Sequence, residues 1–413
     1  MNRLLMPAVL AYIDPGTGSM LFTILFGLIS VFLYSFKGLL IKLKNSFGIR
    51  NVNKDHSKYT IYTDSKRYWS LFKPILEEFE NREIDIDYLT QSEDDDVFKC
   101  DYRYVHPRYI GNSNKAFASL NLINSDILLS TTPSLDVFQW KRSKQCKYYI
   151  HIPHACSDLT LYRLFGIDYY DAILCSGAFQ IDQVRELEKL RNLPAKDMQI
   201  VGLTYFDELA KRLKNNKRTN KEKTVLVAPT WGPNSLLNLY GDKIINALIK
   251  TGYKIIIRPH PQSFSVEKDM IDRIINKYPD IEINSDSDNF DVLNNSDILI
   301  SDYSGVIFDF ALVFNKPIIY ADISFDDSYY DSHWLDIEPW TFNTLEKIGA
   351  KLKEEDLDNI KQLIDNCMTD EKYEKARKQA VKQAWANKGK AAKLIADYMI
   401  EKQKELTKED DRQ

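Results

Sequence analysis

The chain of 413 residues has six histidines, and three of them lie in short loops where a side chain could act on a substrate. His151 and His154 belong to the segment HIPHACSD, which follows a short apolar run typical of a strand. A histidine placed there can act as a general base near neutral pH. Two histidines three residues apart could also bind zinc, but no third ligand has suitable spacing. The alternative is a buried histidine that is only hydrogen-bonded.

The positions of the two histidines favour different roles. His151 ends a run with the alternation of a strand, so its side chain is expected to point into the domain. His154 lies beyond Pro153, where the next helical stretch begins. A base must lie within hydrogen-bond reach of the attacking hydroxyl. We therefore expect His154 to be the base and His151 to support it from behind, and the reverse assignment stays open.

A second loop, RPHPQ, follows the apolar run that ends before Arg258. Two prolines flank His260 and restrict the backbone on both sides of its ring. An arginine and a histidine together suit a phosphate or diphosphate, because the guanidinium can form two parallel hydrogen bonds. We expect Arg258 and His260 to bind phosphate, although a rigid turn with a surface ion pair would use the same residues.

A third segment, DILISDYSGVIFDFAL, has the form of a strand, a small polar turn and a helix. Ser301, Ser304 and Gly305 lie where backbone N–H groups gather at a helix start, an arrangement that binds phosphate. Asp302 would repel phosphate, so within this donor site we expect it to cap the helix or hold a hydroxyl. An ordinary capped helix needs only one such residue.

Two further loops have polar and aromatic residues. Thr230 and Trp231 follow another strand-like run and could line a donor pocket with a hydroxyl and an aromatic face, although Trp231 could equally be packing. The acidic, aromatic stretch at residues 325–334 could bind a divalent ion, but a solvated loop is the simpler interpretation. Nothing in the sequence demands a metal or another cofactor.

These loops are all expected at strand ends, because short β-branched runs alternate with helical stretches along most of the chain. That alternation predicts parallel sheets covered on both faces. Ligands of such open sheets lie beyond the carboxyl ends of the strands, so two successive α/β domains predict a cleft between them. The expected division is residues 1–18, an apolar and turn segment; 19–43, a transmembrane anchor; 44–57, a juxtamembrane linker; 58–214, an acceptor-side α/β domain; 215–222, a linker; 223–345, a donor-binding α/β domain; and 346–413, C-terminal helices with a charged tail.

The N-terminal part differs from the rest in composition. Residues 19–36 contain no charged side chain, and a run of this length can nearly cross a bilayer. Only Arg3 precedes the run, whereas several lysines and arginines follow it. This asymmetry favours an anchor over a cleavable signal peptide. We therefore expect a single-pass protein of the plasma (inner) membrane with cytoplasmic catalytic domains.

Composition excludes several other classes. The formal net charge of −4 argues against a general attraction to nucleic acid. The five cysteines are scattered, with no Cys-x-x-Cys pair. That arrangement argues against a disulfide framework and a thiolate zinc site, and suits a reducing compartment.

The segments VLVAPTW, IIIRPHPQ and DILISDYSGVIFDFALVFNKPIIYAD together resemble the CDP-glycerol glycerophosphotransferase family of teichoic-acid-type polymer synthesis. The resemblance covers roughly residues 198–345. In that family the acceptor-side loop usually contains His-Gly, whereas this chain has His154-Ala155. The resemblance implies a GT-B-like architecture of two Rossmann-like domains.

The resemblance also implies roles for the residues above. His154, or His151, would accept the proton of the acceptor hydroxyl. Arg258 and His260 would stabilise the diphosphate, and the turn from Ser301 to Gly305 would hold donor phosphate. The partners would be a CDP-activated polyol donor and a lipid-linked or polymeric acceptor at a membrane, with release of CMP. Two alternatives stay open: a GT-B glycosyltransferase that uses a nucleotide sugar, and a non-enzymatic assembly protein.

Overall fold

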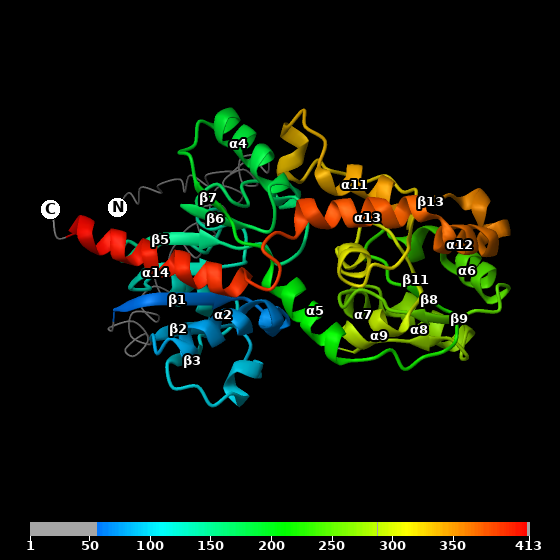
Figure 1. The fold of residues 1–413 in the computed structure, drawn as a ribbon, viewed down its shortest axis with the longest axis horizontal. Helices are drawn as coiled ribbons and strands as arrows, with labels where there is room; N and C mark the ends of the chain where they lie inside the picture. Colours follow the sequence, from blue (N-terminus) through cyan, green and yellow to red (C-terminus); the bar gives the residue numbers. More distant parts are fainter. Residues whose placement is uncertain (1–55, 287, 411–413) are drawn as a thin grey trace, which may run out of the picture. The chain divides into compact units, whose positions relative to one another are not determined.

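The computed structural model describes residues 56–286 and 288–410, which contain two parallel β-sheets (Figure 1). The strands of the first sheet are β1 Ser57–Thr63, β2 Ile86–Thr90, β3 Val105–Tyr109, β4 Ser125–Ser130, β5 Cys146–His151, β6 Ala172–Cys175 and β7 Asp197–Ile200. The strands of the second sheet are β8 Thr224–Val227, β9 Lys254–Ile257, β10 Glu282–Ile283, β11 Ile298–Ser301, β12 Ile318–Ala321 and β13 Gly349–Leu352. Two successive α/β halves were expected from the sequence.

The first sheet has the order β3-β2-β1-β4-β5-β6-β7, and all of its pairings are parallel. Its central strands are buried on both faces, which explains their apolar runs. The edge strand β3 has the sequence VHPRY and was not expected from the sequence. Pro107 has no N–H to donate, so an edge position suits this strand.

The second sheet has the order β10-β9-β8-β11-β12-β13, again with parallel pairing. Its outer strand β13 falls in the range that the sequence suggested to be helical. The sequence GAKL lacks the β-branched run of the other strands, yet Gly349 and Ala350 pair with Ile318 and Ile319. A methyl group on Gly349 would lie 2.6 Å from Ile318 Cγ1, so the strand approaches β12 too closely for a larger residue.

Helices cover both sheets, and the last one returns to the first half. The longer helices are α2 Trp69–Asn81, α4 Phe179–Arg191, α5 Thr204–Asn215, α6 Leu236–Ile249, α8 Lys268–Lys277, α11 Trp340–Ile348, α12 Ile360–Thr369, α13 Glu371–Ala384 and α14 Ala391–Asp410. Helix α14, red in Figure 1, packs on α2 and β4. Within it, Gln403 Nε2 donates to Asp126 Oδ2 at 3.1 Å. The charged tail expected after Glu401 is therefore helical up to Asp410.

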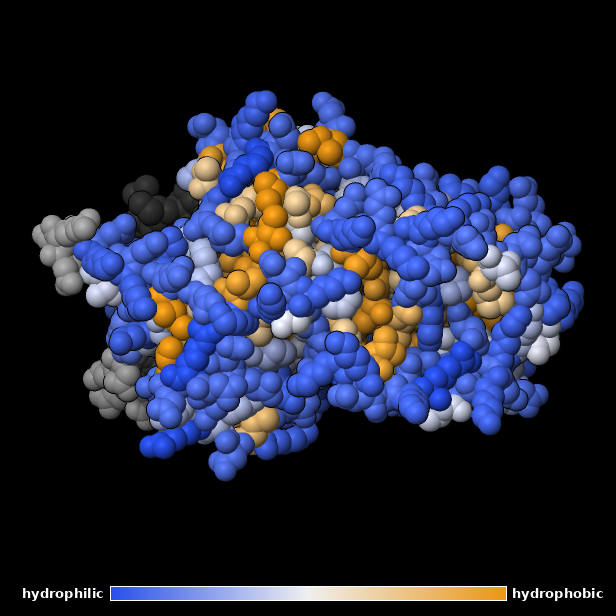
Figure 2. Space-filling model, in the orientation of Figure 1, coloured by the Kyte–Doolittle hydropathy of each residue, from blue (hydrophilic) through white to orange (hydrophobic). Residues whose placement is uncertain are grey.

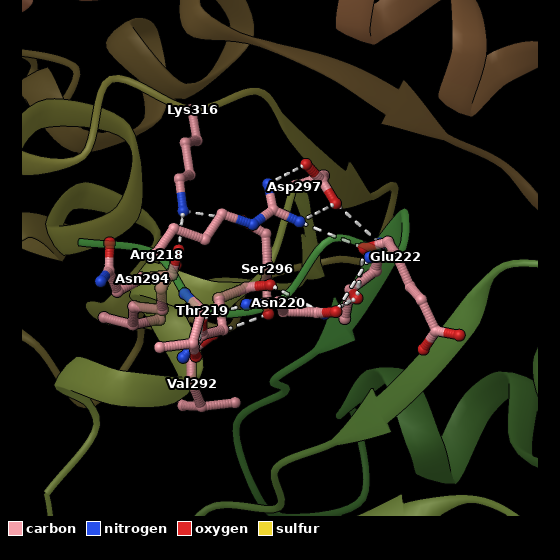
Figure 3. A network of polar contacts seen from close by, with 12 residues as sticks. Arg218, Thr219, Asn220, Glu222, Val292, Asn294, Ser296, Asp297 and Lys316 are labelled. Carbon is pink, nitrogen blue, oxygen red and sulfur yellow. Dashed lines mark hydrogen bonds and ion pairs between the residues drawn. The ribbon is translucent and has the colours of Figure 1, made fainter.

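The segment between α5 and β8, expected to be a linker, is held by hydrogen bonds to the turn before β11 (Figure 3). Arg218 Nη2 donates to Asp297 Oδ2 at 2.8 Å, and the backbone N–H of Thr219 donates to Asn295 Oδ1 at 3.0 Å. Beside them, Lys316 Nζ donates to Ser296 O at 2.7 Å and to two neighbouring carbonyls. Burial lowers the pKa of Lys316 to about 8. These bonds fix the start of the second half.

Two buried carboxylates connect the first half to the segment that follows β12. Asp158 accepts hydrogen bonds from Thr341 N at 2.7 Å and from Trp340 N at 3.1 Å, so it caps helix α11. Asp331 accepts from Arg191 Nη2 at 2.5 Å and from the backbone N–H of Phe165 at 2.9 Å and of Gly166 at 3.2 Å. Residues 325–334 were interpreted as a solvated loop, but Asp331 within them is fully buried.

The expectation of a transmembrane helix requires correction. Residues 19–43 lie outside the described residues. Among residues 56–286 and 288–410, no helix has both the length and the apolar composition needed to cross a bilayer. The longest of these helices, α14, has 20 residues but also charged side chains at nearly every turn. The face drawn in Figure 2 is mostly hydrophilic, with hydrophobic side chains in narrow strips. The single-pass membrane location is therefore not supported.

We expect Asp331→Ala to destabilise the folded chain by about 3 kcal/mol, because it leaves Nη2 of the largely buried Arg191 and two backbone N–H groups without an acceptor. The midpoint of urea denaturation measures the loss. Asp327→Ala is the matched control, since this half-exposed carboxylate of the same loop pairs only with the exposed His333. It should cost less than about 1 kcal/mol. Equal, small effects of the two substitutions would contradict the role of Asp331.

Candidate active site

His154 lies just beyond the carboxyl end of β5, among side chains from the ends of neighbouring strands. Its ring centroid is 5.0 Å from that of Tyr68 and 6.1 Å from that of Tyr162. Its Nδ1 is 3.3 Å from the Thr131 hydroxyl, which follows β4. With Nδ1 turned toward Thr131, Nε2 is the nitrogen that can accept a proton from a substrate.

The protonation of His154 is set by burial and by one cation. Burial, together with a smaller contribution from the positive charge of Arg67, lowers the pKa of His154 to about 4. A neutral imidazole at neutral pH has the form that a general base requires. A bound anion would favour the protonated imidazolium and raise this pKa toward neutrality.

His151 is the last residue of β5 and is fully buried, in agreement with the alternation of its strand. Its Nε2 is 3.2 Å from the Tyr162 hydroxyl, and the Tyr162 ring also lies next to His154. Burial lowers the pKa of His151 to about 3, with a smaller contribution from His154. The structure therefore places His151 behind His154, where it contacts Tyr162 rather than the surface.

His260 follows β9 in the second half and is partly exposed. Its Nδ1 accepts a hydrogen bond from the Gln262 N–H at 3.2 Å, so the ring proton of the neutral form lies on Nε2. Burial lowers the pKa of His260, Arg67 lowers it further, and Glu267 opposes the shift. His260 can thus donate a hydrogen bond through Nε2 to a phosphate oxygen. Trp231 is 41% exposed, and its ring centroid is 6.5 Å from that of His260, so Trp231 is not core packing.

Arg258 is oriented differently from the sequence expectation. Its guanidinium donates to Asn284 Oδ1 and, at 2.8 Å, to the backbone carbonyl of Asp286. Burial lowers the pKa of Arg258. The guanidinium of Arg258 is thus already hydrogen-bonded within the second half, at the carboxyl end of β10.

Ser301 and Asp302 are buried beneath the turn that follows β11, and their polar atoms are satisfied by the protein. The Ser301 hydroxyl donates to Ala228 O at 2.5 Å. Asp302 accepts from Thr230 N at 2.8 Å and from Leu236 N, the first residue of α6, at 3.0 Å. Burial raises the pKa of Asp302, and these two N–H donors oppose the shift. Both residues hold the loop that bears Thr230 rather than facing a ligand.

Ser304 and Gly305 are at the surface of the same turn, opposite the His154 loop. Gly305 is exposed, and a methyl group placed on it would lie 3.9 Å from Ala155 Cβ. The carboxyl ends of β5 and β11 therefore approach each other. We use "the junction" for the residues gathered here from the two halves: Arg67, Tyr68, His154, Ala155, Ser304 and Gly305, together with His260, whose pKa the charge of Arg67 also lowers.

Sequence reasoning did not select Arg67 or Tyr68, which come from the loop and short 3-10 helix η1 Lys66–Tyr68 after β1. The available signal was their position just after β1, at the end of a strand, where ligands of open sheets lie. Their residue types were uninformative, because a lone arginine beside a tyrosine is common on protein surfaces.

Asp309 is a third residue that the sequence did not point to. It opens a π-helix, η4 Asp309–Val313, and accepts a hydrogen bond from the Tyr205 hydroxyl at 3.1 Å. Burial raises the pKa of Asp309 to about 7. Irregular helical turns are frequent at functional sites. Here the carboxyl group lies within the core below the Gly305 turn and connects the second half to α5.

Other polar clusters of the described residues have simpler explanations. Within residues 56–286 and 288–410, no group of three or more His, Cys, Asp or Glu side chains is arranged to hold a metal ion. A concavity of about 580 Å³ near the start of β1 contains His56 and His106, but these pair with Asp126 and Asp85. Another of about 640 Å³ lies between α6 and α8. Neither contains residues of the junction, so we place the site by its side-chain chemistry.

Comparison with known proteins gives one family match. A family model described as CDP-Glycerol:Poly(glycerophosphate) glycerophosphotransferase matches residues 188–401, which is more than half of the chain. A stretch of 151 residues is 30% identical to the Minor teichoic acid biosynthesis protein GgaB of Bacillus subtilis (strain 168). That match covers 29% of this chain and 16% of GgaB, so the chain spans only a small part of that relative.

Solved structures with low sequence identity share the fold. The wall teichoic acid polymerase TagF has a TM-score of 0.57 at 16% identity, with 91% of this chain and 97% of that chain covered. A substituted TagF soaked with CDPG gives the same values. UDP-GlcNAc 2-epimerase from Neisseria meningitidis, bound to UDP-GlcNAc, has a TM-score of 0.51 at 13% identity, with 84% and 100% covered. The fold is therefore GT-B-like, with two parallel α/β halves and a helical C-terminus.

We expect the folded chain to lose stability as the pH falls from about 6.5 toward 4. The unfolded chain takes up protons on His151 and His154 near pH 6.5, whereas burial lowers their folded pKa values to about 3 and about 4. Because the unfolded state then binds more protons, the free energy of unfolding decreases by up to about 1.4 kcal/mol per pH unit for each histidine.

Urea denaturation at pH 7, 6 and 5 measures this slope. His151→Gln removes one buried imidazole, so its stability should fall less steeply with pH than that of the wild type. The raised pKa of the buried Asp309 has the opposite effect, because its protonation stabilises the folded chain as the pH falls. Comparing His151→Gln with the wild type therefore isolates the contribution of His151. The exposed His333 provides the control, and His333→Gln should keep the wild-type slope. An unchanged slope in His151→Gln would refute the prediction.

Proposed function

Because the chain belongs to the CDP-glycerol:poly(glycerophosphate) glycerophosphotransferase family, we propose that it transfers glycerol phosphate, or a related polyol phosphate, from a CDP-activated donor to an acceptor hydroxyl. The acceptor would be a lipid-linked or polymeric chain of the teichoic acid type, and CMP would be released. The family membership supports the CDP-glycerol donor, and the approach of Gly305 in the second half to Ala155, the residue next to His154, is the observation that carries the mechanism.

The reaction is a displacement at phosphorus. The acceptor hydroxyl attacks the phosphorus that bears the polyol, its proton passes to a base, and the bond from that phosphorus to the CMP oxygen breaks. CMP leaves with the electron pair of this bond. Such transfers depend on positioning and on stabilisation of charge rather than on a covalent enzyme intermediate.

His154 is the proposed base. It is neutral at neutral pH because burial and Arg67 lower its pKa, and Thr131 orients its Nδ1. The approach of a negatively charged diphosphate would raise the pKa of His154 and make the imidazole a stronger proton acceptor as the donor binds. His151 would support it through Tyr162, whose ring lies beside both histidines.

The second half would hold the donor. His260 would donate through Nε2 to the diphosphate, and the Ser304–Gly305 turn would offer backbone N–H groups to it. The exposed ring of Trp231 would line the donor pocket. Arg258 would contribute charge from the edge of this site, since its fork is engaged with Asn284 and Asp286. We propose no metal cofactor in this mechanism.

We expect the purified chain to release CMP from CDP-glycerol or CDP-ribitol when an acceptor with free hydroxyls is added. Chromatography of the nucleotides measures the product, and the rate should persist in the presence of EDTA. UDP- and GDP-sugars serve as the comparison donors, because a nucleotide-sugar transferase of the same fold would use these instead. Turnover of a UDP- or GDP-sugar without turnover of CDP donors would overturn the proposal.

We expect His154→Ala to lose roughly 10²- to 10⁴-fold in kcat, the range for removal of a general base. Binding of the donor should change little, and the acidic limb of the pH–rate profile should vanish. His151→Ala should be milder in kcat and should also lower the denaturation midpoint, because it opens a cavity in the core. If His151→Ala is inactive and His154→Ala is active, the two roles are reversed.

A further inference from the structure

Arg67 lies in η1, the short 3-10 helix that follows β1. It is exposed, and its guanidinium carbon lies 4.9 Å from the centroid of the Tyr68 ring. The same ring lies next to His154, whose ring centroid is 5.0 Å from that of Tyr68. Tyr68 therefore contacts both the arginine and the proposed base.

The charge of Arg67 reaches both halves of the site. Burial is the main reason for the lowered pKa of His154, and Arg67 is the second. The pKa of His260, in the other half, is likewise lowered first by burial and then by Arg67. A single cation thus lies close to the group proposed to accept the proton and to the group proposed to bind the diphosphate.

No carboxylate within residues 56–286 and 288–410 forms an ion pair with Arg67. The adjacent Lys66, by contrast, forms an ion pair with Asp94. Asp64 interacts with Arg67 only at longer range, and its Oδ1 is buried without a hydrogen-bond partner. Arg191, by contrast, is largely buried and uses its fork on Asp168 and Asp331, whereas the guanidinium of Arg67 is exposed to solvent and accessible to a ligand.

We propose that Arg67 binds the phosphoryl group in transfer, that is, the phosphate of the donor whose bond to CMP breaks. This assignment rests on the proposed transfer reaction. A guanidinium can form two parallel hydrogen bonds to phosphate oxygens. It would neutralise the charge on the phosphate while the acceptor oxygen attacks, and it would leave the proton to His154.

The affinities of CDP and CMP for the full chain, measured by calorimetry, test the assignment without turnover. The β-phosphate of CDP stands for the phosphoryl group in transfer, and CMP lacks it. Arg67→Ala should weaken CDP binding by about tenfold or more, the effect of one lost charged hydrogen bond. CMP binding should change less than about threefold. Arg67→Lys should be intermediate, because it keeps the charge and loses the fork.

Lys66→Ala is the matched control, since it removes one positive charge from the same turn at a residue that pairs with Asp94. It should bind CDP and CMP as the wild type does. Equal weakening of CDP and CMP by Arg67→Ala, or no weakening of either, would overturn the assignment. Arg67→Ala could weaken the binding of CDP alone while the wild type transfers nothing from CDP-glycerol. That result would refute the proposed reaction and still support the phosphate contact.

Discussion

The arrangement of the site depends on buried carboxylates that water cannot reach. Asp158 and Asp331 are almost completely buried, so a donor from the protein must meet each of their oxygens. The donors lie on distant parts of the chain: the start of α11 for Asp158, and Arg191 with two backbone N–H groups for Asp331. Separation of these parts would leave unpaired charges in the interior. The ends of β5 and β11 are therefore held near each other by the hydrogen bonds of these buried carboxylates as well as by apolar packing.

The same principle divides the polar residues of the second half into two groups. Ser301 and Asp302 are hydrogen-bonded to Ala228, Thr230 and Leu236, so their atoms shape the loop after β8. His260 and the turn at Ser304 and Gly305 remain at the surface. A motif that looks continuous in sequence thus has a buried part that supports the backbone and an accessible part that can meet a ligand.

The strands that form the site were predictable because each contains a short run of apolar, β-branched or aromatic residues. β8, β9, β11 and β12 also lie between helical stretches, whereas β5 follows β4 without a helix between them. The edge strands β3 and β13 were missed because strands exposed along one edge need no such run. The histidine loops were predictable from their place after those strands, and the inward orientation of His151 followed from the period of two.

The sequence by itself determined the two α/β halves, the loops that bear His154, His260 and Ser304, and the resemblance to one transferase family. These features depend on the pattern of neighbouring residues, which can be recognised in one sequence. Only the tertiary structure decided that Arg258 is engaged with Asn284 and Asp286, and that Arg67 lies near both histidines. The physical reason is that the sequence around an arginine does not show whether its guanidinium is hydrogen-bonded within the protein. The neighbours that folding brings to the guanidinium therefore determine what it can bind.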